Sequence, residues 1–271
     1  MQNYINIILG AKGGIGKTVI TTYLAEFLMV KKRQKITVID TDTNNGTLIK
    51  YPFFMSRFID FKDETGAITA LSIQEQIAEE YSNANAIIDT GANSYYAWFS
   101  YLRDMMGVQM LQIKGAKVLI HVPIVPGQMQ TECFNCLKEI VNADLGAEIV
   151  VHLNNGFNSF GQGIKNERLP NAIEIVNMPM WAPFAGKIKY IVEEPRIQIT
   201  MKHTYDSIRN QYITLSEIAD SSLDNLKNYS MLGEDNIPTR KASACDKLMC
   251  QKIRSDIFNN YKVLDPLYDI K

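Results

Sequence analysis

The segment Gly10-Ala-Lys-Gly-Gly-Ile-Gly-Lys-Thr18 lies between an apolar run at residues 5–9 and a helical pattern that starts near Val19. A buried strand, a glycine-rich turn and a helix N-terminus in this order can hold phosphate groups, because the turn amides and the positive end of the helix dipole face the same point. The glycines accept backbone angles, and a close approach to a ligand, that a Cβ atom would prevent. We therefore expect a strand, a phosphate-binding loop and a helix here.

The side chains of this loop suit a magnesium nucleotide. Lys17 can reach the β- and γ-phosphates, and the Thr18 hydroxyl can bind Mg²⁺. The strict Walker A pattern has a glycine where this chain has Ala11, so the loop departs from that pattern. A glycine-rich turn with incidental lysines is the alternative interpretation. The residues expected to contact the nucleotide are Gly13, Gly14, Ile15, Gly16, Lys17, Thr18 and Val19.

The departure from the strict Walker A pattern points to a particular family. Lys12-Gly-Gly-Ile-Gly-Lys-Thr18 resembles the deviant Walker A motif, KGGxGK[ST], of the ParA/MinD family of P-loop ATPases. The resemblance implies a slow ATPase that binds Mg²⁺–ATP, closes into an ATP-dependent homodimer and opens after hydrolysis. Lys12 occupies the position of the family's signature lysine, which would reach the phosphates of the partner subunit. A structure in which that lysine is pinned in an internal ion pair would remove the functional interpretation and leave only an α/β fold.

Two aspartates follow the strand expected at residues 36–40. A site for a magnesium nucleotide needs one carboxylate near the metal's water shell and one group that orients the attacking water. Asp40 and Asp42 resemble the DxD segment of the family, and by that resemblance Asp40 supports the metal shell while Asp42 positions or deprotonates the water. Turn-forming aspartates after a strand are the alternative. The resemblance thus makes Lys12, Lys17 and Asp42 the catalytic residues.

Two more strand ends carry candidate residues. Asp89 ends the strand expected at residues 84–89, where a carboxylate can hold a water bound to Mg²⁺, and Gly91 allows the following turn to move. This segment resembles the DTPPG-like segment of the family. Asn154 follows the strand expected at residues 147–153, at a position where an asparagine of the family often contacts adenine. A plain Asn-Gly turn is equally compatible with the sequence.

Strands alternate with helices along the chain, which predicts an α/β fold with a doubly wound, mainly parallel sheet and helices on both faces. We expect a P-loop ATPase domain at residues 1–227, a linker at 228–241 and a C-terminal helical appendage at 242–271. Further strands are expected at residues 117–125 and 172–176, and helices at 19–29, 72–81, 95–111, 129–141, 204–226 and 242–261.

Composition limits the partners. The net charge of −1 gives no overall attraction to nucleic acid, so any DNA contact must be local. No apolar stretch approaches the length of a membrane span, and the chain shows no signal peptide, so we expect a cytoplasmic protein. Membrane binding through the last helix is the least expected of its roles. The resemblance implies that scattered basic residues late in the chain contact DNA non-specifically through its phosphates, and a solvated amphipathic face is the alternative. These residues are Lys187, Lys189, Arg196 and Lys202.

The cysteines allow two interpretations. Cys133 and Cys136 fall in an expected helix, where their spacing places them on one face. Buried reduced thiols are the favoured interpretation, and a four-thiolate zinc site with Cys245 and Cys250 is the alternative.

Short stretches near residues 89–94 and 120–128 look most similar to TraL/MobD-type proteins of plasmid conjugation and mobilisation. The resemblance implies a plasmid transfer or partition protein as the partner. Three alternatives remain open at this point. The first is a plasmid partition ATPase, and the second is a nucleotide-dependent scaffold with little turnover that recruits relaxosome or secretion components. The third is a small-molecule kinase or transferase, for which the sequence shows no dedicated acid or base residues.

Overall fold

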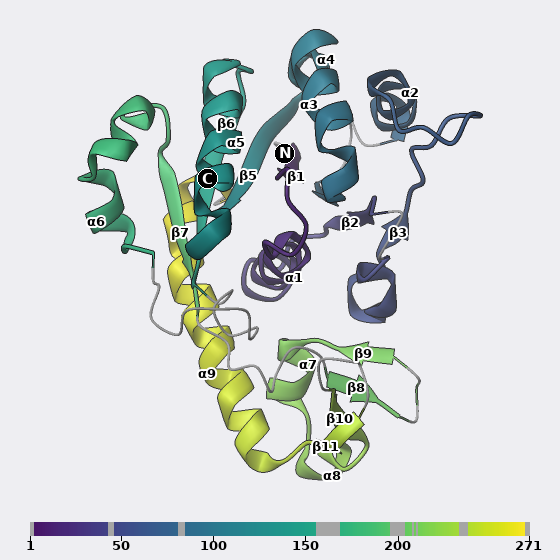
Figure 1. Cartoon of the computed structure of the whole chain (residues 1–271). Helices are drawn as coiled ribbons and strands as arrows, with labels where there is room; N and C mark the ends of the chain where they lie inside the picture. The colour runs from purple at the N-terminus through teal and green to yellow at the C-terminus, as the bar shows by residue number, and fades with distance from the viewer. Residues whose placement is uncertain are drawn as a thin grey trace.

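A seven-stranded parallel sheet lies at the centre of the molecule, in the order β3-β2-β4-β1-β5-β6-β7 (Figure 1). The computed structural model describes residues 3–42, 46–80, 85–155, 169–195, 204–207, 209, 211–232 and 238–268. The central strands are mainly apolar because both faces of the sheet are covered. The strands are β1 Asn3–Ile8, β2 Thr37–Asp40, β3 Arg57–Phe58, β4 Ala86–Asp89, β5 Ala116–Ile124, β6 Glu148–Asn154 and β7 Tyr190–Glu194.

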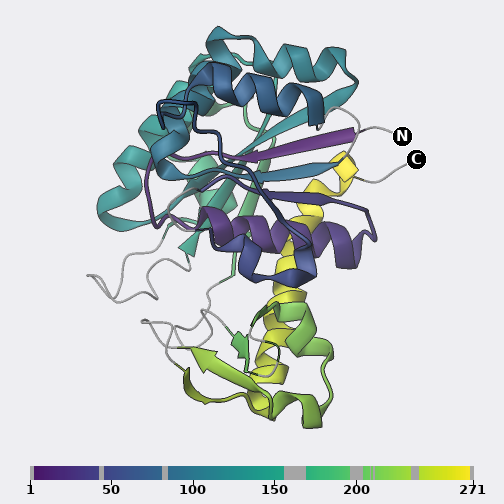
Figure 2. The same ribbon diagram turned by 90° about the vertical axis from the view of Figure 1, so that its right-hand side faces the viewer.

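Helices cover both faces of this sheet, as Figure 2 shows with the sheet nearly edge-on. One face, here called the α3 face, carries α2 Ala70–Glu80, α3 Tyr95–Asp104, α4 Gly107–Ile113 and α5 Gln130–Asn142. The other, the α1 face, carries α1 Lys17–Glu26, α9 Ala244–Asn260, the 3₁₀ turn η9 Tyr261–Leu264 and α10 Asp265–Tyr268. The expected doubly wound α/β fold is therefore confirmed.

A smaller antiparallel sheet lies below α1, in the order β11-β10-β8-β9 (Figures 1 and 2). α9 runs from this sheet up to the large one. The elements of this part are β8 Thr204–Asp206, β9 Gln211–Ile213, α7 Leu215–Asp220, α8 Leu223–Leu226, β10 Tyr229–Leu232 and β11 Pro238–Lys241.

Glu26 attaches this smaller part to α1. Its buried carboxylate accepts hydrogen bonds from the backbone N–H groups of Leu215 and Ser216, at 3.2 and 3.1 Å, and from the Ser216 hydroxyl at 2.5 Å. Burial raises the pKa of Glu26 to about 7, against the opposing effect of the Ser216 hydrogen bond. A second contact joins the ring centroids of Tyr51 and Tyr212 at 5.3 Å. The small sheet is thus packed on the large domain.

The structure corrects the expected strand at residues 172–176, which form a short helix, α6 (Ala172–Val176). Asn171 and Glu174 form a reciprocal capping box around its first turn, and this local signal outweighs the alternating apolar pattern. The last parallel strand is β7 instead.

The structure also differs from the secondary structure expected in three other segments. Residues 204–226, expected as one helix, contain two strands and two short helices capped by Thr214 and Ser222. Residues 228–241, expected as a linker, carry β10 and β11, and β10 pairs with β8. The helix expected at residues 95–111 is two helices, which meet at Met106 with a φ of +54°.

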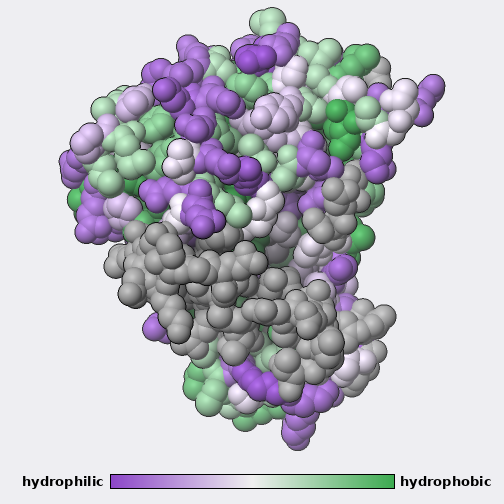
Figure 3. Space-filling view, viewed as in Figure 1, coloured by the Kyte–Doolittle hydropathy of each residue, from purple (hydrophilic) through white to green (hydrophobic). Residues whose placement is uncertain are grey.

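None of the helices that the structure describes combines the length and apolar character of a membrane span. In the view of Figure 3, hydrophilic and hydrophobic residues are interspersed over the upper part of the molecule. Lys187 and Lys189 are exposed next to β7. The other two candidates for DNA contact, Arg196 and Lys202, lie outside the described residues.

An ion pair between a half-exposed arginine and a buried aspartate holds β11 to the start of α9, and its loss should destabilise the fold. The Arg240 guanidinium donates to both oxygens of Asp246, at 2.6 and 2.5 Å, and holds the pKa of that carboxyl down, at about 2. Asp246 is buried, so Arg240→Met would leave its charge without this partner. We expect a loss of about 1–3 kcal/mol in the free energy of unfolding, measured by urea denaturation, since Arg240 is itself half-exposed.

The matched control is Arg103→Met. Arg103 makes the same two-pronged contact with Asp104, but both side chains are half-exposed. Such a surface pair adds little, so the control should unfold like the wild type. If both variants lost the same free energy of unfolding, burial of Asp246 would not be the reason that its ion pair stabilises the fold.

Candidate nucleotide-binding site

Three central strands end at one level of the sheet. Ile8 of β1 is paired in register with Asp89 of β4, and Asp89 is paired with Asp40 of β2. Since the strands are parallel, their carboxyl ends form one edge, where ligands of such sheets bind. The glycine-rich loop leaves β1 at this edge and leads into α1. The sequence-predicted loop, DxD segment and strand-ending aspartate therefore lie side by side.

The loop has an open side and a packed side. A Cβ atom built on Gly13 or Gly14 would meet no atom within 4 Å, so there is room for a ligand against this part of the backbone. Gly16 is different, because its φ is +91° and a Cβ there would lie 2.3 Å from Asn154 Nδ2. Gly16 is also the residue before the first turn of α1. Only a glycine fits that position.

Lys17 is buried at the helical end of the loop, with 7% of its surface exposed. Its Nζ donates a hydrogen bond of 2.8 Å to the carbonyl of Lys12, so the side chain folds back along the loop. Burial lowers the pKa of Lys17, and the nearby charges of Asp89 and Asp42 oppose that effect. A buried ammonium at this place is suited to an anionic ligand, which would offset its desolvation.

Asp89 ties α1 to the sheet. Its two carboxylate oxygens accept hydrogen bonds from the hydroxyls of Thr18, at 2.7 Å, and Thr21, at 3.1 Å. Burial raises the pKa of Asp89 to about 7, while the Thr18 hydrogen bond acts in the opposite direction. The role of Thr21 was not foreseen from the sequence. Its spacing of three residues from Thr18 on a helix was the available signal.

Asp40 and Asp42 differ in what surrounds them. Both carboxylate oxygens of buried Asp40 accept backbone N–H groups, from Asp42 at 3.1 Å and from Leu48 at 2.9 Å, so Asp40 shapes the turn after β2. Burial raises the pKa of Asp40. Asp42 is half-buried and lies beside Gly91, where a Cβ atom would be 3.2 Å from Asp42 Oδ1. The structure thus brings Asp42 and Gly91 together at the strand ends.

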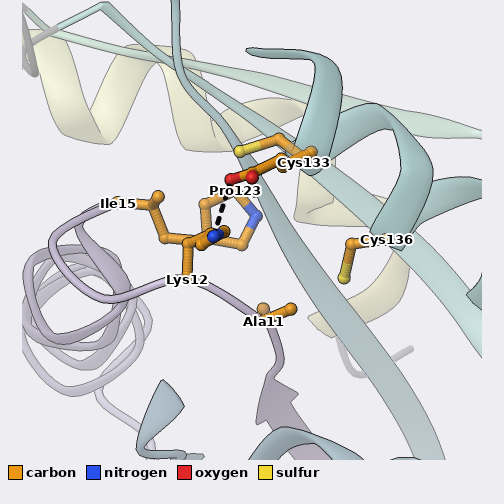
Figure 4. Close-up of a pocket in the computed structure, with 8 residues that line it drawn as sticks. Ala11, Lys12, Ile15, Pro123, Cys133 and Cys136 are labelled. Carbon is orange, nitrogen blue, oxygen red and sulfur yellow. Dashed lines mark ion pairs between the residues drawn. The ribbon is translucent and has the colours of Figure 1, made fainter. Parts of the chain in front are cut away.

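Lys12 forms an ion pair within its own subunit. Its Nζ lies 3.0 Å from Glu132 Oε2, as the dashed line in Figure 4 marks, and the side chain points toward the helix that carries Cys133 and Cys136. The two paired side chains are 46% and 49% exposed. A pair at that exposure is worth about 0–1 kcal/mol, so it holds Lys12 only weakly. The Lys12–Glu132 ion pair is therefore present, but its small stabilising energy allows Lys12 to leave Glu132 for another anionic partner.

A narrow pocket of about 10 Å³ lies behind Lys12, and it is too small for a nucleotide. Cys133 and Cys136 line it and are buried, and burial raises the pKa of the Cys133 thiol to about 11. Cys250 is buried on α9, which covers the opposite face of the sheet from α5. The four-thiolate zinc site is therefore wrong. Among the described residues, no group of three or more His, Cys, Asp or Glu side chains is placed to hold a metal by itself.

Asn154 contacts the loop directly. Its Nδ2 donates a hydrogen bond of 3.0 Å to the Ile15 carbonyl, and the side chain is buried. Asn154 therefore braces the peptide that precedes Gly16. A contact between Asn154 and a base stays a prediction.

Comparison with known proteins bears on this site. No protein-family model matches the chain. The chain is 31% identical to Protein TraL of Escherichia coli over 126 residues, which are 46% of this chain and 51% of that protein. The resemblance to TraL-type proteins is thereby confirmed. The chain spans about half the length of the curated relatives it matches.

Solved structures give more distant matches. A plasmid partition protein of Borrelia burgdorferi is 14% identical with a TM-score of 0.40, over 71% of this chain and 92% of that chain. The MinD cell division protein of Aquifex aeolicus is 18% identical with a TM-score of 0.38, over 71% of this chain and 83% of that chain.

Replacing the glycine on the packed side of the loop should destabilise the fold, whereas replacing one on the open side should leave stability unchanged. Gly16→Ala should lower the free energy of unfolding by about 1–3 kcal/mol, because alanine is strained at positive φ and its methyl group would displace Asn154. Gly13→Ala is the control, since its φ is not positive and its methyl group meets nothing, and it should change stability by no more than about 0.5 kcal/mol. Thermal or urea unfolding without nucleotide measures both. A loss at Gly13 as large as that at Gly16 would contradict the described loop.

Proposed function

We propose that the chain binds Mg²⁺–ATP and hydrolyses it slowly, as an ATP-dependent homodimer that acts in plasmid DNA transfer or partition. The observation that carries the proposal is the loop between β1 and α1, whose open glycines lie next to a buried Lys17 and to the Thr18–Asp89 pair. The identity to TraL supports the plasmid context.

The donor set at the strand ends suits Mg²⁺. This ion takes one or two carboxylates, and at P-loops a hydroxyl, together with waters and phosphate oxygens. Thr18 and Asp89 would hold it, with Asp40 supporting its water shell, and the bound ion would offset the negative charge of the phosphates.

The remaining roles belong to residues around the loop. Lys17 would bind the phosphates in place of the Lys12 carbonyl, and Asp42 would orient the attacking water beside Gly91. Lys12 would leave Glu132 for the phosphates of the second subunit, where its charge would offset the charge of the transition state. Exchange of the weak pair is the step that couples dimer formation to hydrolysis.

Size-exclusion chromatography with ATP, ADP or no nucleotide tests this proposal. We expect an ATP-dependent dimer in the wild type, a longer-lived dimer in Asp42→Ala because hydrolysis is lost, and an impaired dimer in Lys12→Ala. Glu132→Gln serves as the control for Lys12, since it removes only the ion pair within the subunit and should dimerise at least as well as the wild type. An elution position that ignores nucleotide in all four proteins would rule out the switch.

Asn154 offers a second test. Its loss should affect nucleotide binding differently if it supports the Ile15 carbonyl than if it contacts the base. If Asn154 acts through the Ile15 carbonyl, Asn154→Ala weakens the binding of ATP and GTP by the same factor. We expect about a tenfold loss for both, which corresponds to one hydrogen bond of about 1.4 kcal/mol. Equilibrium binding of fluorescent ATP and GTP analogues measures the ratio. A loss confined to ATP would assign Asn154 to the base instead.

A further inference from the structure

Four polar side chains form a buried row on the α1 face of the large sheet. Asn6 of β1, His121 of β5, His152 of β6 and Glu194 of β7 come from four adjacent strands, and each is at most 4% exposed. His121 Nε2 lies 3.0 Å from Asn6 Oδ1, His121 Nδ1 lies 2.8 Å from His152 Nε2, and His152 Nδ1 lies 2.6 Å from Glu194 Oε1. The row is separate from the loop and its aspartates.

Asn6 sets the direction of the hydrogen bonds. Its Nδ2 donates a bond of 3.1 Å to the carbonyl of Ala86, so its Oδ1 faces His121 and Tyr268. An amide oxygen can only accept, and the Tyr268 hydroxyl donates to the same atom. His121 must therefore carry a hydrogen on Nε2.

Because His121 carries a hydrogen on Nε2, the number of hydrogens shared along the whole row can be counted. Three contacts join its four members, and each contact needs one hydrogen. Two neutral imidazole rings supply two, and a third must be added to Glu194, His152 or His121. The count is the same for a protonated carboxyl beside neutral rings and for a carboxylate beside one imidazolium. With only two hydrogens, one contact would join two lone pairs.

We propose that the Asn6–His121–His152–Glu194 row is a buried proton-binding site, which holds one proton in the folded protein at neutral pH. The ligand is a hydrogen ion from solvent, and its release leaves the carboxylate of Glu194 with two neutral rings. No other reactant takes part.

The titratable groups that face the row come from the elements packed on it. The Tyr261 hydroxyl of η9 donates to Glu194 Oε1 at 2.8 Å, Tyr268 of α10 contacts Asn6, and Tyr23 of α1 lies near Glu194. Burial raises the pKa of all three tyrosines, so they are neutral when the row titrates. They therefore supply no charge that could replace the proton.

The direction in which folding stability changes with pH follows from the pKa values in the folded and the unfolded chain. Burial raises the pKa of Glu194 to about 8 and lowers that of His152 to about 3, whereas the unfolded chain has ordinary values of about 4.3 and about 6.5. Above about pH 6.5 the unfolded chain lacks the proton that the folded row still holds. Stability therefore falls as pH rises from about 6.5 to 8, by up to about tenfold in the unfolding equilibrium constant per pH unit.

Glu194→Gln tests the site, because the side-chain amide can donate to His152 Nδ1 as a protonated carboxyl does, yet it cannot titrate. Urea unfolding between pH 7 and 8 should show a rise of the unfolding constant that is about fivefold larger in the wild type than in Glu194→Gln, because a group with a pKa of about 8 has released about half of its proton at pH 8. Glu26→Gln is the control, since Glu26 is another buried carboxyl with a pKa raised to about 7 that lies off the row. Because its own pKa is about 7, Glu26→Gln should reduce the rise between pH 7 and 8 by only about twofold. A rise unchanged by Glu194→Gln would overturn the proposal.

Nitrogen-15 NMR of histidine-labelled wild type tests the same site without a variant. The chain has three histidines, so the spectrum is simple to assign. We expect His121 to carry its hydrogen on Nε2 at pH 7, and the row to lose one proton near or above pH 8. An unprotonated Nε2 of His121 at pH 7 would overturn the proposal, even if Glu194→Gln failed to fold.

Discussion

The site depends on the contact between α1 and the carboxylate of Asp89. A buried carboxylate that lacks partners costs several kcal/mol, and here the hydroxyls of Thr18 and Thr21 satisfy both of its oxygens. The backbone carbonyl of Asp89 also accepts the Thr41 hydroxyl at 2.7 Å, which joins β4 to the end of β2. One residue therefore fixes the first turn of the helix, and with it the loop, relative to the DxD segment.

The sequence was sufficient for the central strands and their ends. Strands β1, β2, β4, β5 and β6 are apolar runs that stop at a turn or a polar residue, and parallel order then places their ends together. The last third of the chain could not be predicted in this way. Its strands are short, and Glu26 and Tyr51 attach it to α1 and to the segment after Asp42, contacts between residues far apart in the chain. A capping box at Asn171 was visible, yet the alternating pattern of α6 concealed it.

Within the site, residue types were easier to predict than their partners. Lys17, Thr18, Asp42 and Asp89 were predicted because a magnesium nucleotide needs those groups and because the resemblance to the ParA/MinD family gives their order along the chain. The partners came from elements whose positions only folding determines. Lys12 meets Glu132 of α5, and Ile15 meets Asn154 of β6, across separations of 120 and 139 residues that no periodicity reveals.

The polar row and the loop are linked through β6. Successive side chains of a strand alternate between faces, so His152 and Asn154 share the α1 face with Val150. A slip of one residue in β6 would turn all three away, and the row and the brace of the loop would be lost together. An apolar strand tolerates such a slip because one branched side chain replaces another at small cost. Polar partners on β5, on β7 and in the loop make the same slip expensive, because each would leave a buried group without its hydrogen bond. The buried row thus contributes to the placement of the glycine-rich loop, although it lies outside the loop.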